Sequence, residues 1–130
     1  MKKVVLLLRV STNSQDYEYQ RNTLTDLCSR NDWEIVHTVE NKVSGAKKNE
    51  ERQDIVELID FVKNHKVDMV VATEVSRLGR NTLEALKVIE LLNEKGICLY
   101  IKNYNLETIV DGKINPVAAL ICTILLEISN

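Results

Sequence analysis

Residues 4–12 read Val4-Val5-Leu6-Leu7-Leu8-Arg9-Val10-Ser11-Thr12, and the prediction of the fold starts from them. Five consecutive large aliphatic residues, between a pair of lysines and a polar segment, predict a strand that is buried on both faces. Such strands are typical of parallel sheets that carry helices on both sides. The strand ends with Arg9 and Ser11, which point to the same side because side chains alternate along a strand.

Arg9 and Ser11 fall at the carboxyl end of the predicted strand, which is where ligands bind in open α/β sheets. Arginine is rarely buried without a partner, and a hydroxyl beside a guanidinium suits the binding of a phosphate or attack on it. The alternative is structural: Arg9 forms a surface ion pair and Ser11 caps the next helix. By themselves, these two residues favour the structural alternative.

Length and composition restrict the class of protein. A chain of 130 residues with 45% hydrophobic and 28% charged residues is expected to form one soluble domain. It has no signal-peptide pattern and no apolar run of membrane-spanning length, so we expect it in the cytoplasm. The net charge of −2 argues against a freestanding DNA-binding module, although it allows an enzyme with a local cationic site.

Metal and disulfide sites are not predicted. The three cysteines are odd in number, far apart and set in apolar patterns, so we interpret them as reduced core thiols. His37 and His65 are isolated from any second ligand and are interpreted as ordinary residues. No metal and no cofactor is therefore expected.

Strand and helix patterns alternate along the rest of the chain. They predict an α/β fold with a mainly parallel sheet of four or five strands, helices on both faces and a long apolar C-terminal helix. The third helix is expected to bury Leu83, Leu86, Ile89 and Leu92 and to stop at Gly96. The predicted helices cover residues 14–31, 51–63 and 81–95, the further strands 33–39, 67–73 and 97–101, and polar loops 41–50 and 102–112.

The last segment, residues 114–128, contains eleven apolar residues out of fifteen, and they lie all round the predicted helix. A helix that is apolar on every side must be covered on every side, and this one is too short to cross a bilayer. We therefore expect a second subunit to cover it. The expected interface consists of Leu120, Ile121, Ile124, Leu125 and Ile128.

A second polar block, Ser76-Arg77-Leu78-Gly79-Arg80, follows the third predicted strand at the same sheet edge. If Arg80 opens the next helix, the helix amides add to an anion site. There is no phosphate-binding P-loop, and Glu74 is the one acidic residue at a strand end, so neither a nucleotide-triphosphate site nor a metal-dependent nuclease is predicted. A serine without histidine or metal needs arginines to attack a phosphodiester.

Together these blocks resemble the catalytic domain of serine site-specific recombinases, the resolvases and DNA invertases. The resemblance follows the chain in order and covers nearly all of it. It rests on Arg9-Val10-Ser11-Thr12, Gln20, Val43-Ser44-Gly45 with Arg52, and Ser76-Arg77-Leu78-Gly79-Arg80.

The resemblance implies that Ser11 is the nucleophile and forms a phosphoserine bond to the 5′ end of cleaved DNA. It implies that Arg9, Arg77 and Arg80 hold the scissile phosphate, and that Arg52 and Gln20 complete the pocket. Neither ATP nor a metal would be required. Members of this family form dimers that join into tetramers on DNA. Further DNA contacts are expected from Lys47, Lys48 and Asn81.

Two departures from the family leave questions open. The family usually carries an aspartate before Arg-Leu, where this chain has Ser76, so proton transfer falls to Glu74, to another residue or to none. The family also continues into a DNA-binding domain, so residues 1–130 are expected to be a catalytic-domain fragment. Alternative functions are transposition by the same chemistry, or a non-catalytic module that dimerises or binds phosphate.

Overall fold

The aliphatic run at the start of the chain forms β1 (Lys3–Val10), which lies inside the sheet between β2 and β3. The computed structural model describes residues 1–10, 14–42, 53–79 and 81–129. The other elements are α1 (Ser14–Arg30), β2 (Glu34–Lys42), α2 (Gln53–Asn64), β3 (Met69–Ala72), the 3₁₀ helix η1 (Val75–Leu78), α3 (Thr82–Glu94), β4 (Cys98–Ile101), the 3₁₀ helix η2 (Lys102–Tyr104), β5 (Leu106–Glu107), β6 (Ile109–Val110), β7 (Lys113–Ile114) and α4 (Pro116–Ser129).

The sheet has the order β2-β1-β3-β4-β5, and its first four strands run parallel. The fifth strand of this sheet, β5, runs antiparallel to its neighbour β4. The predicted mainly parallel sheet of four or five strands is therefore confirmed. All carboxyl ends of β1, β3 and β4 lie at one edge, so the segments that leave these strands meet there.

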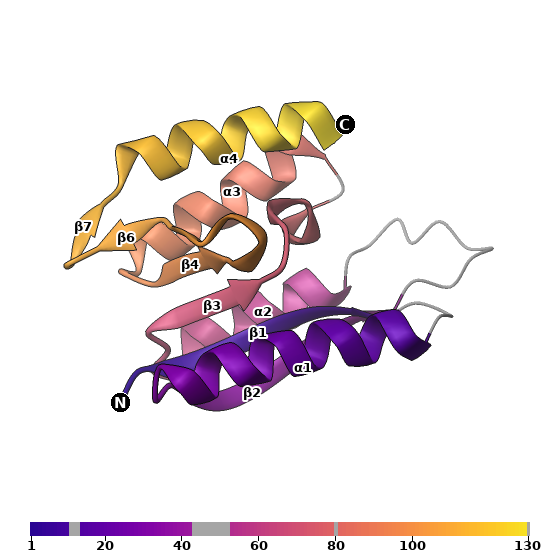
Figure 1. Cartoon of the computed structure of the whole chain (residues 1–130). Helices are drawn as coiled ribbons and strands as arrows, with labels where there is room; N and C mark the ends of the chain where they lie inside the picture. Colours follow the sequence, from indigo (N-terminus) through magenta and orange to yellow (C-terminus); the bar gives the residue numbers. More distant parts are fainter. Residues whose placement is uncertain (11–13, 43–52, 80, 130) are drawn as a thin grey trace.

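Both faces of the sheet are covered, as the aliphatic run predicted (Figure 1). Alternate β1 residues Val4, Leu6 and Leu8 pack with α1, whereas Val5 and Leu7 belong to the core on the opposite face. That opposite core includes residues of α2, α3 and α4. Burying one such aliphatic side chain contributes about 1.5–3 kcal/mol, which explains why β1 organises both layers.

The third helix differs in one respect from its prediction. It begins after Asn81, whose side-chain oxygen accepts a hydrogen bond from the Glu84 amide at 3.0 Å. Leu83 then lies in the first turn with 63% of its surface exposed, so its predicted burial is wrong. The helix ends before Gly96, whose φ of +71° confirms the predicted glycine stop.

Gly79 follows η1 at a point where the chain backbone lies very close to the first turns of α3. A Cβ atom at this position would lie 2.6 Å from the amide nitrogen of Ala85 and 2.9 Å from the Cβ of Glu84. Leu78, just before it, is fully buried. The Leu-Gly pair therefore fixes η1 against the first turn of α3, and with it the backbone of the neighbouring Arg77.

The segment predicted as a polar loop after β4 contains more structure than expected. It forms η2, β5 and an antiparallel hairpin of β6 and β7. Thr108 is buried there, and its hydroxyl oxygen accepts a hydrogen bond from the Leu99 amide at 2.8 Å. Because these strands are only two residues long, they leave no periodic pattern in the sequence.

The C-terminal helix α4 packs along one side of the molecule beside α3 and η1 (Figure 1). Its buried stripe consists of Ala118, Cys122 and Leu126, spaced four residues apart. Among the helices of the described ranges, none has the length and apolar character to cross a membrane.

Candidate active site

Arg9 stands near the end of β1, two residues beyond the last contact of β1 with β3. That pairing ends at Leu7 with Ala72, whereas β1 continues beside β2 as far as Val10. The Gln20 carboxamide binds the exposed backbone: the Arg9 amide donates to Oε1 at 2.8 Å, and Nε2 donates to the Arg9 carbonyl at 2.6 Å. Gln20 thus supplies both hydrogen bonds that another strand would supply.

The position of Gln20 defines one face of α1. Asp16, Tyr19, Gln20 and Thr23 follow the i, i+3, i+4, i+7 spacing of a single helix face. The adjacent face carries Leu24, which is buried against the sheet. The helix therefore presents a polar face to the sheet edge while its apolar face covers β1.

Arg77 is held at the same edge by η1. Its Nη2 lies 3.6 Å from Oε2 of Glu74, and 19% of the Arg77 side chain is exposed. The Glu74 carboxylate also accepts a hydrogen bond from the Ser76 hydroxyl at 3.3 Å and one from the side-chain Nδ2 of Asn103 at 3.4 Å. This chain has Ser76 directly before Arg77, at the position where an aspartate was expected from the resemblance. Glu74 nevertheless places a carboxylate beside the Arg77 guanidinium.

Arg9, Gln20 and Arg77 meet in one hollow of about 500 Å³ at the carboxyl edge of the sheet. The α1 face forms part of its lining, and η2 together with Thr73, which follows β3, forms another part. The described lining residues are Arg9, Asp16, Tyr19, Gln20, Thr23, Thr73, Arg77, Lys102 and Asn103.

The charges of the hollow suit an anion. Arg9, Arg77 and Lys102 provide three positive groups, whereas Asp16 is the one acidic residue among the described lining residues. A guanidinium presents a planar set of N–H donors that matches phosphate oxygens. The arrangement can therefore bind a phosphate between the strand ends, directly beside the backbone that continues to Ser11.

Several predicted site residues fall outside the described residues. Their placement, including the shared side of Ser11 and Arg9, is not part of the structure. They are Ser11, Lys47, Lys48, Arg52 and Arg80.

Two further sets of predicted residues are described. Asn81 is exposed and caps α3, and its contact with DNA stays a prediction. In α4, Leu120, Ile124 and Ile128 are 62%, 50% and 76% exposed, Ile121 is half-buried, and Leu125 packs partly against the core. Of the residues predicted for the subunit interface, Leu120, Ile124 and Ile128 are therefore exposed, whereas Leu125 packs towards its own domain.

Two residues that line the hollow, Tyr19 and Lys102, were not predicted from the sequence. Lys102 directly follows the last residue of β4, so the rule that located Arg9 at a strand end applied to it equally. Tyr19 precedes Gln20 but carried no signal of its own, because a single exposed tyrosine is common. Only the packing of α1 over the sheet edge brings it to the arginines.

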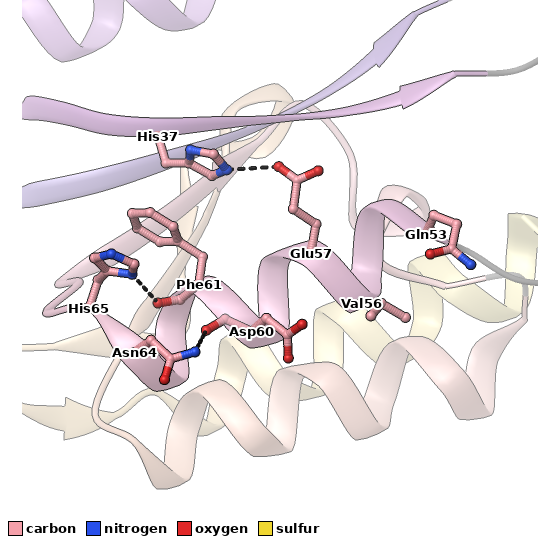
Figure 2. Close-up of a pocket in the computed structure, with 8 residues that line it drawn as sticks. All are labelled: His37, Gln53, Val56, Glu57, Asp60, Phe61, Asn64 and His65. Carbon is pink, nitrogen blue, oxygen red and sulfur yellow. Dashed lines mark hydrogen bonds and ion pairs between the residues drawn. The ribbon is translucent and has the colours of Figure 1, made fainter.

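A second hollow of about 470 Å³ lies between β2 and α2 (Figure 2). Phe61 is stacked between His37 and His65, with ring centroids 4.3 and 4.1 Å apart, and His37 Nε2 lies 2.7 Å from Glu57 Oε2. The two histidines are thus less isolated than predicted. Glu57 and Asp60 make this hollow acidic, so it does not suit a phosphate.

The described residues include no group of three or more His, Cys, Asp and Glu side chains that could hold a metal ion. The three cysteines are buried and form no disulfide. Burial raises the pKa of each thiol, and that of Cys28 to about 11. A thiol of such high pKa is a poor nucleophile at neutral pH, because the thiolate is the reactive form.

Comparisons with known proteins agree with one another. A family model described as "Resolvase, N terminal domain" matches residues 4–125. A curated resolvase from Clostridium perfringens is 31% identical over an alignment of 124 residues that covers 93% of this chain. The chain spans only 59% of the length of that relative.

Solved structures with a similar fold include the N-terminal catalytic domain of TP901-1 integrase, with a TM-score of 0.74 and 25% identity over 98% of this chain and 94% of that one. A resolvase family site-specific recombinase from Streptococcus pneumoniae has a TM-score of 0.77 over 99% and 88% of the chains, and its 24% identity supports the fold alone. The catalytic domain of ISC1926 TnpA, an IS607-like serine recombinase, has a TM-score of 0.63 and 28% identity over 77% and 68%.

Proposed function

This chain belongs to the family of resolvase N-terminal domains, and on that premise we propose that it cleaves and rejoins DNA strands through a phosphoserine intermediate at Ser11. The observation that supports this most is the meeting of Arg9 and Arg77 in one hollow at the strand edge. Because β1 leads from Arg9 directly towards Ser11, a phosphate bound by the arginines would lie near the serine.

The proposed reaction exchanges one phosphate ester for another. The Ser11 Oγ attacks phosphorus, the new O–P bond forms, and the bond from phosphorus to the 3′ oxygen breaks. The serine proton leaves and the 3′ oxygen gains a proton, so a free 3′ hydroxyl and a 5′ phosphoserine result. Rejoining reverses these steps with another 3′ hydroxyl. The phosphoserine ester conserves the energy of the phosphodiester, so we propose that neither ATP nor a metal ion is needed.

The arginines would act on the charge of the transferring phosphate. Guanidinium groups that meet the non-bridging oxygens mainly in the transition state accelerate the reaction more than they strengthen binding. Arg9 and Arg77 are proposed for this role together with Arg80, and Arg52 completes the pocket. Gln20 is a positioning residue, since its hydrogen bonds hold the Arg9 backbone. Glu74, 3.6 Å from Arg77, positions that guanidinium.

We propose DNA as the partner and a homodimer that forms a tetramer when two DNA sites are brought together. The exposed apolar residues of α4 support a subunit interface there. Lys47, Lys48 and Asn81 are proposed to contact the DNA backbone. Transposition by the same chemistry remains the alternative, which differs in the choice of DNA site.

The first test traps the covalent intermediate. The chain is incubated with random-sequence duplex DNA in excess chelator, stopped with denaturant, and searched by mass spectrometry for a nucleotide on Ser11. The wild-type chain should give the adduct, and Ser11→Ala should give none. Ser29→Ala, which changes an exposed serine near the far end of α1, serves as the matched control and should trap normally.

Three outcomes would contradict parts of the proposal. An adduct that persists in Ser11→Ala would exclude Ser11 as the nucleophile. Trapping that requires added Mg²⁺ would exclude the metal-independent mechanism. DNA binding without any adduct in the wild-type chain would favour the non-catalytic alternative.

A further inference from the structure

The hollow at the sheet edge is larger than two arginines and one phosphate require. Its volume of about 500 Å³ lies within the range of sites that enclose whole small ligands. Beyond Arg9 and Arg77 it is lined by an aromatic residue, Tyr19, and by a further cation, Lys102. Neither has a role in the proposed bond exchange.

Tyr19 is held in place although its ring is uncovered. It directly precedes Gln20, whose two hydrogen bonds attach α1 to the end of β1. Its surface is 74% exposed, and among the described residues its side chain has neither a hydrogen bond nor a ring contact. A fixed helix position therefore presents a largely uncovered aromatic ring at a cationic hollow.

Lys102 lines the same hollow from η2, and its backbone is also fixed. The residue before it, Ile101, is fully buried at the end of β4. The backbone amide of the next residue, Asn103, donates a hydrogen bond to the Thr73 carbonyl at 3.1 Å. The Lys102 side chain is half-buried, and it forms no ion pair within the described part of the chain.

We propose that this hollow binds an unpaired nucleotide of the DNA strand next to the reacting phosphate. The Tyr19 ring stacks on its base, and the Lys102 ammonium binds its phosphate. An aromatic platform beside a cationic groove is the arrangement by which proteins hold single strands without reading sequence. A base inside a duplex could not stack on Tyr19, so the strand is locally unpaired when it enters the hollow. This inference rests on the proposed function, because it places the nucleotide beside the phosphate that Arg9 and Arg77 bind.

The test uses the chain labelled with 3-fluorotyrosine and observed by ¹⁹F NMR. Three probes are titrated: inorganic phosphate, single-stranded tetrathymidylate, and an abasic tetramer with the same backbone. The Tyr19 resonance, assigned with Tyr19→Phe, should shift with tetrathymidylate but little with the other two probes. The resonance of Tyr104, which is 55% exposed and does not line the hollow, should stay unchanged.

Affinity measurements separate the base contact from the phosphate contact. Tyr19→Ala should weaken tetrathymidylate binding by about 5- to 150-fold, the range of one base–aromatic stack. It should leave abasic binding unchanged, whereas Tyr19→Phe should bind as the wild type does. Tyr104→Ala is the matched control. Lys102→Ala should lower the slope of log affinity against log salt by about 0.7 for a single strand, and Lys102→Arg should restore it.

Failure of this inference can be distinguished from failure of the proposed function. If Tyr19→Ala binds tetrathymidylate as tightly as the wild type, or if tetrathymidylate does not bind, the stacking site is overturned. Arg9→Ala and Arg77→Ala should each reduce binding of both the abasic and the base-carrying tetramer. If neither does, the phosphate site itself is wrong, and the proposed function loses its main support.

Discussion

Arg9 and Arg77 reach the same hollow in different environments. Arg9 projects from the end of β1 and is exposed, whereas Arg77 sits on η1 with 19% of its side chain exposed and a carboxylate at 3.6 Å. Water screens a charge more strongly at an exposed position than at a half-buried one. Arg77 should therefore contribute more to the electrostatic stabilisation of the transferring phosphate, and Arg9 relatively more to its initial binding.

Replacing either arginine by lysine tests whether it acts on the transition state. Lysine keeps the charge but loses the planar set of donors. A transition-state arginine is worth about 10³–10⁵ in rate, so Arg77→Lys should reduce single-turnover adduct formation by orders of magnitude. The affinity for DNA should stay within about tenfold of wild type, because lysine keeps the positive charge that neutralises a phosphate. Arg9→Lys should have the same effect to a smaller extent.

Arg30→Lys provides the control, because Arg30 pairs with Asp26 on the surface at the far end of α1. It should leave both rate and affinity unchanged. Near-normal adduct formation by Arg77→Lys would mean that Arg77 is only an ion-pair partner of Glu74.

At the scale of the element, α4 combines two packing roles. One stripe, Ala118, Cys122 and Leu126, belongs to the domain core, and the opposite side leaves Leu120, Ile124 and Ile128 exposed. The same helix contacts η1, which carries Arg77. The exposed side supports the proposed interface, because much of its apolar surface is left uncovered in a single subunit.

Ile124→Asp should separate association from folding. If a second subunit covers Ile124, a charge there raises the dissociation constant of the dimer by at least about tenfold, because a buried, unpaired carboxylate is strongly unfavourable. Analytical ultracentrifugation at micromolar concentration should show dimers for the wild type and monomers for the variant, with an unchanged circular dichroism spectrum. Val56→Asp on α2 is the matched control, since Val56 is 51% exposed and Ile124 is 50% exposed.

A wild-type chain that sediments as a monomer at every concentration would rule out this interface. Leu125→Asp is a poorer test, because Leu125 packs partly against its own core and the variant would also destabilise the fold.

At the scale of the whole molecule, the three buried thiols connect stability to pH. Cys28 belongs to the core under α1, and Cys122 to the core on the other face. The pKa of Cys28 is raised by burial to about 11, whereas an unfolded thiol titrates near about 8.5. The unfolded chain therefore binds fewer protons than the folded one between these values, and unfolding becomes easier as pH rises through that window.

Urea unfolding at pH 8, 9, 10 and 11 should reveal this effect. The contribution of Cys28 is complete below about pH 8.5 and is lost towards pH 11, with a slope of at most about 1.4 kcal/mol per pH unit for one thiol. Cys28→Ala lowers the stability at every pH but should make the alkaline decline shallower. Equal slopes for the two proteins would mean that the Cys28 thiol ionises equally in the folded and unfolded chains.

The layers of this protein could be predicted from its sequence. The aliphatic run of β1 required cover on both faces. The alternating helix and strand patterns placed Arg9 at the end of one parallel strand and Arg77 after another, and these strands, β1 and β3, are neighbours in the sheet. These features could be predicted because local periodicity records which side chains are buried, and the direction of a strand records the edge at which it ends. Leu83 shows where this reasoning stops, because its apolar character alone did not reveal that it lies in the exposed first turn of α3.

Tertiary structure alone decided what surrounds the arginines. The Gln20 carboxamide binds the Arg9 backbone because β3 ends two residues before β1 reaches Arg9, and Tyr19 and Lys102 face the hollow because α1 and η2 border the same edge. α4 is likewise divided into a covered and an uncovered side by its position against α3 and η1. Each of these contacts joins residues far apart in the sequence, and such contacts leave no local pattern because they depend on where whole elements pack.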